Sequence, residues 1–156
     1  MLEAWPSSRE INATVAGRIA GLLDEQGGPV AELGYRTMRA DSGVLSEQPH
    51  SLASVVVVGS CLAAGADWQA ALWPAAGAEC MMAAADLLDD VADGDRAYQL
   101  ADAPGVVLTA AAGLLSLAGA AIARVVEDGA APTTAVAFLA SPSAALGRRW
   151  CRKDGP

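Results

Sequence analysis

Six aspartates gather between residues 86 and 102, and their spacing is the strongest indication of chemistry in this sequence. The charged residues of this segment are Asp86, Asp89, Asp90, Asp93, Asp95, Arg96 and Asp102. Each residue of an α-helix turns by about 100°, so Asp86, Asp89/Asp90 and Asp93 share one face, with Asp89 and Asp93 one turn apart. Like charges at this spacing are destabilising, and carboxylates at the C-terminal end of a helix oppose its dipole. Divalent cations would reverse both effects.

The pattern Asp-Asp-x-x-Asp at residues 89–93 predicts a magnesium site with Asp89, Asp90 and Asp93 as ligands. Mg²⁺ takes one or two carboxylates and completes its shell with water and phosphate oxygens, so such a site could hold a diphosphate through bridging ions. A solvated acidic helix end has the same pattern, and both interpretations stay open. The Ala, Met and Leu residues before the motif favour a cavity with a charged mouth and apolar walls.

The elements that must position these carboxylates are predicted to be helices. The chain is 53% hydrophobic, yet it holds one Phe and two Tyr, and Ala dominates its apolar residues. Ala is the best helix former and a poor strand former. We therefore expect an all-α bundle with Ala-lined interfaces, and the length of 156 residues fits a single domain over 1–156.

Caps, prolines and glycines place the helix boundaries. The expected helices run from a capping box at 7–10 to about 27, from 29 to 39, from 51 to 64, from 75 to 91, from 103 to 126, and from 132 onward. Asp67 is expected to cap a short turn, 41–50 to form a loop, and 147–156 to fray. Four consecutive valines at 55–58 allow a buried strand instead, but the flanking alanines and the absence of a partner strand favour a helix.

Composition excludes several classes of protein. A net charge of −8 argues against nucleic-acid binding, which needs a basic face. The single histidine, His50, and three widely spaced cysteines argue against His- or Cys-based metal sites. The first residues lack a signal-peptide pattern, which favours the cytoplasm. Residues 103–123 are uncharged and long enough to span a bilayer, but their small side chains favour a buried core helix.

Residues 83–95, Ala-Ala-Ala-Asp-Leu-Leu-Asp-Asp-Val-Ala-Asp-Gly-Asp, resemble the first aspartate-rich motif of trans-polyprenyl (isoprenyl) diphosphate synthases. The apolar helices expected on either side are also similar, so the resemblance covers about 51–126. It implies the N-terminal half of the all-α isoprenoid synthase fold, with Mg²⁺ and an allylic diphosphate bound at the motif. The substrate-contacting residues that the resemblance implies are Met81, Met82, Ala85, Ala78 and Arg96. Core packing is the other interpretation of the two methionines.

Two departures from the family shape the expected function. Residues 43–50 hold Glu47 and no Lys or Arg, where the family has a basic segment for the second diphosphate. The second aspartate-rich motif of the family is also absent from this sequence. We therefore expect Mg²⁺-dependent binding of an allylic isoprenoid diphosphate by a truncated or split synthase, in a homo- or hetero-oligomer with a synthase-like chain. Whether this chain alone is an enzyme stays open. A non-catalytic helical subunit is the alternative, and a membrane protein rich in small residues is the third.

Overall fold

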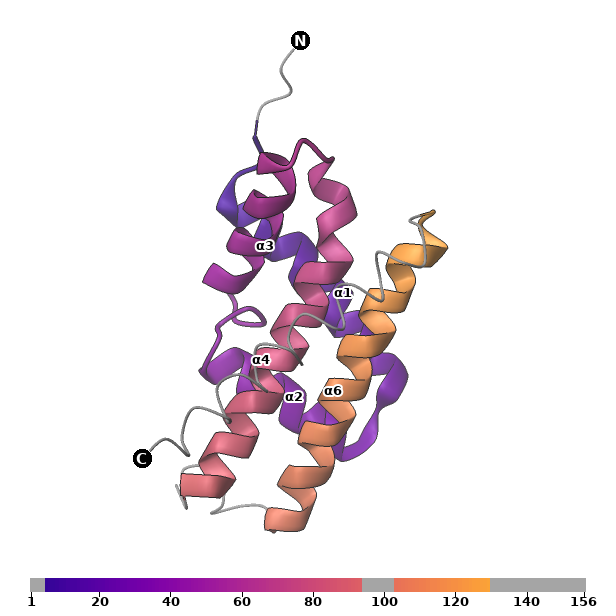
Figure 1. Ribbon diagram of the computed structural model, residues 1–156. Coiled ribbons are helices and arrows are strands. Elements are labelled where there is room, and N and C mark those ends of the chain that lie inside the picture. The colour runs from indigo at the N-terminus through magenta and orange to yellow at the C-terminus, as the bar shows by residue number, and fades with distance from the viewer. Residues whose placement is uncertain (1–4, 94–102, 130–156) are drawn as a thin grey trace, which may run out of the picture.

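The described part of the chain, residues 5–93 and 103–129 of a computed structural model, is all-α (Figure 1). Its elements are α1 (Ser8–Gln26), α2 (Gly28–Ala40), α3 (Leu52–Ala63), the short 3₁₀ helix η1 (Trp68–Ala71), α4 (Leu72–Asp93) and α6 (Pro104–Glu127). The predicted all-α class is confirmed. Residues 55–58 lie within α3, so the strand alternative was wrong. Arg96, the helix predicted from 132 and the tail 147–156 lie outside the described residues.

Side-chain caps begin three of these elements where the sequence predicts them. Ser7 Oγ accepts a hydrogen bond from the amide of Glu10 at 3.2 Å, which is the N-cap contact of the predicted capping box. Ser51 caps α3 through the amide of Ala53, and Asp67 caps η1 through the amide of Gln69. These contacts satisfy amides that a helix N-terminus leaves without an intrahelical partner.

Among the described helices, α4 and α6 share the most extensive interface and run side by side (Figure 1). Alanine is the commonest buried residue on both helices: Ala75, Ala76, Ala83 and Ala84 on α4, and Ala110, Ala111, Ala118 and Ala121 on α6. The backbones approach closely, because a methyl group added at Gly77 would lie 3.2 Å from the carbonyl oxygen of Ala118. The expectation of Ala-lined interfaces is therefore confirmed.

The loop between α2 and α3, residues 41–51, brings polar groups to the middle of α4. The loop turns at Gly43, whose φ of 68° is one that L side chains rarely adopt. The carbonyl oxygen of Gly43 accepts hydrogen bonds from the amides of Ser46 and His50, and Val44 is fully buried. These contacts fold the loop back on itself, so that its two ends, Asp41 and Ser51, both reach the site described next.

Candidate functional site: an acidic cleft

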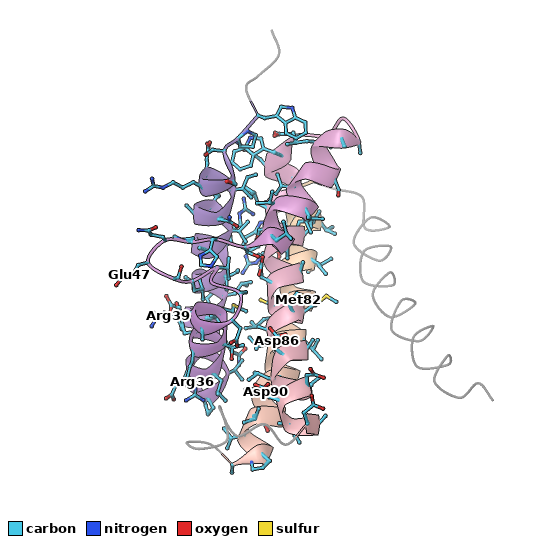
Figure 2. The ribbon with its side chains drawn as sticks, turned by 90° about the vertical axis from the view of Figure 1, so that its left-hand side faces the viewer. Arg36, Arg39, Glu47, Met82, Asp86 and Asp90 are labelled. Atoms are coloured by element: carbon cyan, nitrogen blue, oxygen red, sulfur yellow. The ribbon has the colours of Figure 1, made fainter. Side chains whose placement is uncertain are left out.

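A cleft of about 500 Å³ lies between α4 and the two ends of the α2–α3 loop. We call it the acidic cleft, and it is lined by Asp41, Ser42, Ser51, Leu52, Ala53, Glu79, Met82, Asp86, Asp89 and Asp90. Figure 2 shows Met82, Asp86 and Asp90 in order along α4. Their spacing of four residues places these side chains on one face of the helix.

The structure brings together only part of the predicted aspartate site. Asp89 and Asp90 line the acidic cleft together with Asp86. Asp93, the third predicted ligand, is exposed at the end of α4 and does not belong to the cleft lining. The helical period correctly groups the aspartates on one side of α4, but the cleft lies toward the N-terminal members of the group.

The residues expected to contact the substrate are also dispersed. Met82 lines the acidic cleft and is 50% exposed. Met81 instead packs against the hydrophobic core, as the alternative interpretation proposed. Ala78 and Ala85 are not part of the cleft lining, although both lie on α4.

Several cleft residues were missed at the level of sequence. Asp41, Ser42 and the first residues of α3 reach the cleft only because the loop folds against α4. Glu79 carried a usable signal, because it is the single charged residue between Asp67 and Asp86. A lone carboxylate in an Ala-rich helix needs a specific partner, since burying an uncompensated charge is costly.

Glu79 finds that partner at the N-terminus of α3. It is 1% exposed, and its Oε1 accepts hydrogen bonds from the amide of Ser54 at 3.0 Å, the hydroxyl of Ser54 at 2.6 Å and the hydroxyl of Ser51 at 2.5 Å. A helix N-terminus carries partial positive charge and free amides, so a carboxylate is stabilised there. The second oxygen, Oε2, is buried and has no hydrogen-bond partner among the described residues.

Carboxylates around Asp86 repel one another. Burial raises the pKa of Asp86, and the nearby charges of Asp41, Asp90 and Asp89 raise it further. The ionised form of Asp86 is therefore disfavoured in the protein without a ligand. A cation bound in the cleft would lower this repulsion.

Basic residues lie on α2 rather than in the loop at residues 43–50. Arg36 and Arg39 line a second hollow with Glu32, Tyr35 and Ala40, and the guanidinium of Arg39 lies 5.2 Å from the centre of the Tyr35 ring. Figure 2 shows both arginines on α2, at the height of Asp86 and Asp90 on α4.

The donor atoms of the acidic cleft are carboxylate and hydroxyl oxygens, which are the ligands of Mg²⁺. In the described part of the chain, no three His, Cys, Asp or Glu side chains lie close enough to hold one metal ion together. The arrangement therefore fits an ion that keeps most of its waters and takes one or two carboxylates. It does not form a direct three-aspartate chelate.

Comparison of the chain with models of protein families, with curated proteins and with solved structures finds no match. The resemblance to trans-polyprenyl diphosphate synthases is therefore supported by the motif at residues 83–95.

Proposed function

We propose that the acidic cleft binds Mg²⁺ and, through it, the diphosphate group of an allylic isoprenoid. One observation carries the proposal: Asp86, Asp89 and Asp90 line a single cleft with Asp41, where burial and then the charges of these neighbours raise the pKa of Asp86. A divalent cation relieves this repulsion and presents free coordination positions to phosphate oxygens. The diphosphate itself is suggested by the motif at residues 83–95.

The lining suggests a role for each side of the cleft. Asp86, Asp89 and Asp90 would hold the hydrated cation, and Mg²⁺ would neutralise the charge on the diphosphate. Met82 and Leu52, which are 50% and 77% exposed, offer apolar surface to the prenyl chain. Turnover would need a synthase-like partner chain with the second metal-binding face, in a cytoplasmic oligomer related to the N-terminal half of the isoprenoid synthase fold.

Calorimetric titration with farnesyl diphosphate in the presence of Mg²⁺ tests this assignment. The double variant Asp89→Asn/Asp90→Asn is expected to lose binding. Asp93→Asn makes a matched control, because it removes the same charge from the same helix outside the cleft lining. It is expected to retain binding within a fewfold of the wild type. Equal binding by the wild type and the double variant would contradict the proposal.

A second function, that of a helical interaction subunit, is favoured by the outer face of α6. No residue from Pro104 to Ala123 is charged, and Val106, Leu108 and Leu115 are 37%, 44% and 47% exposed. The solvent face of a helix normally carries charged residues, and exposed apolar patches mark interaction surfaces. Sedimentation analysis tests this candidate: the wild type should associate, and Leu108→Ser/Leu115→Ser should be monomeric.

The same helix is the one described element that could cross a membrane by length and composition. Its most apolar stretch of 18 residues has a mean hydropathy of 2.1, and 44% of that stretch is buried within the bundle. A core helix of a soluble bundle has the same properties. The properties of α6 therefore do not distinguish a membrane helix from a core helix, and we do not propose a membrane protein.

A further inference from the structure

We infer that the acidic cleft takes up Mg²⁺ as a hydrated ion, and that Glu79 accepts a hydrogen bond from a metal-bound water. The inference rests on the proposed function and adds a residue outside the aspartate motif. Glu79 lines the cleft although it is 1% exposed, and its Oε2 has no hydrogen-bond partner among the described residues. Glu79 would be a positioning residue, because it acts on the ion through water.

The two oxygens of Glu79 have different environments. Oε1 is saturated by three donors from Ser51 and Ser54, whereas Oε2 has none. A buried carboxylate oxygen without a donor is costly, and more so when the group is charged. A donor that enters with the ligand would remove this cost. A prenyl chain offers no donor, but a water polarised by Mg²⁺ donates strongly.

Glu79 and the aspartates do not come together as a group of three or more direct ligands among the described residues. Glu79 and Asp86 are seven residues apart, which corresponds to about 10.5 Å along a helix. Two carboxylates that ligate one Mg²⁺ directly, at about 2.1 Å each, bring their oxygens within about 4.2 Å of each other.

A layer of water extends the reach of the ion to a suitable length. A metal–oxygen distance of about 2.1 Å and a short hydrogen bond of about 2.7 Å place an acceptor about 4.8 Å from the metal. Acceptors on opposite sides of a hydrated ion can then lie up to about 9.6 Å apart. Because Glu79 lines the same cleft as Asp86, Asp89 and Asp90, a hydrated Mg²⁺ held by the aspartates would present a metal-bound water to Glu79 Oε2.

Hexaamminecobalt(III) tests the inference on the wild-type protein. This cation resembles hydrated Mg²⁺ in size, but it does not exchange its ammine ligands and binds only through their hydrogen bonds. It is expected to bind with one-to-one stoichiometry and to be displaced by Mg²⁺ in calorimetric competition. If Mg²⁺ binds and hexaamminecobalt(III) does not compete with it, the ion is held directly and the inference is wrong.

A pair of variants locates the acceptor. Glu79→Gln replaces Oε2 or Oε1 by a donor, and loss of such an outer contact weakens metal binding by about 10- to 100-fold in known sites. Glu47→Gln removes the same charge from the exposed loop outside the cleft, so it controls for the net charge of the protein. We expect at least tenfold weaker binding of hexaamminecobalt(III) by Glu79→Gln, and binding by Glu47→Gln within twofold of the wild type.

The outcomes separate this inference from the proposed function. If both variants bind hexaamminecobalt(III) equally weakly, or if both bind it as tightly as the wild type, Glu79 does not have the inferred role, but the magnesium site is not affected. Failure of wild-type protein to bind either Mg²⁺ or hexaamminecobalt(III) contradicts both proposals.

Discussion

Glu79 on α4 accepts a hydrogen bond from the backbone amide of Ser54 at 3.0 Å, so a carboxylate 25 residues further along the chain caps the first turn of α3. This contact fixes the start of α3 against α4. Because Ser51, Leu52 and Ala53 line the acidic cleft, the cap also shapes one wall of the site.

The cap predicts a stability difference between two variants. Glu79→Ala removes the acceptor of three hydrogen bonds and leaves buried donors of Ser54 without it, so we expect a loss of about 2–3 kcal/mol in the free energy of unfolding. Ser54→Ala removes one donor and leaves the other two, and should cost about 1 kcal/mol. Urea denaturation of both variants measures the difference. A Glu79→Ala variant as stable as the wild type would show that the cap is not needed for folding.

Asp86 predicts a pH-dependent gain in stability on neutralisation. Its raised pKa means that the folded protein keeps this proton to higher pH than the unfolded chain does. Stability is therefore lost as the pH rises from the ordinary aspartate pKa of about 3.9 through the folded pKa. Without metal, Asp86→Asn should melt at a higher temperature than the wild type at pH 7, and the gain should disappear below about pH 4. Melting curves across this range, with Glu47→Gln as the control for net charge, check the prediction. A gain in melting temperature that does not change with pH would contradict it.

The close approach of α6 to the start of α2 predicts opposite effects at two glycines of α6. A methyl group added at Gly113 would lie 2.5 Å from Val30 Cγ2, whereas one added at Gly119 meets nothing within 4 Å. Gly113→Ala should therefore lower the free energy of unfolding by about 1–3 kcal/mol. Gly119→Ala should raise it by up to about 1 kcal/mol, because Ala is the better helix former. Denaturant unfolding of the pair measures both values, and equal effects would refute the packing described between Gly113 and Val30.

The two described cysteines are expected to differ in reactivity. Burial, followed by the charge of Glu79, raises the pKa of Cys80 to about 12, and the thiol is fully buried. Cys61 is half-buried, with a pKa raised by burial and by Asp67. Because the thiolate is the reactive form, iodoacetamide at pH 8 should label Cys61 in the native protein and Cys80 only after unfolding. Peptide mass spectrometry identifies the labelled residue. Rapid native labelling of Cys80 would contradict its burial in the bundle.

Local signals explain why much of the fold could be predicted from the sequence. Ser7, Ser51 and Asp67 act on amides two or three residues away, so their roles as caps can be deduced from neighbouring residues alone. The apolar stretches between them have helical composition throughout. The valines at 55–58 were ambiguous because a short apolar run fits a strand or a buried helix equally well.

The site was harder to predict because its second wall comes from another part of the chain. Asp86, Asp89 and Asp90 are grouped by the period of one helix. Their proximity to Asp41 depends on how the α2–α3 loop folds against α4, and no local sequence pattern specifies this. The same dependence explains Asp93: helical spacing gives the face of α4, but packing decides which part of that face borders the cleft.

Thermal melting of the wild type with Mg²⁺ and farnesyl diphosphate, each alone and both together, tests the central claim most directly. A ligand that binds only the folded protein raises the free energy of unfolding by mass action, by about 2.7 kcal/mol at a hundredfold excess over Kd. The melting temperature rises with it. We predict a small shift with Mg²⁺ alone, none with farnesyl diphosphate alone, and a shift with both that exceeds the sum. No shift under any of the three conditions, or the same shift with farnesyl diphosphate whether or not Mg²⁺ is present, would contradict a metal-dependent diphosphate site in the acidic cleft.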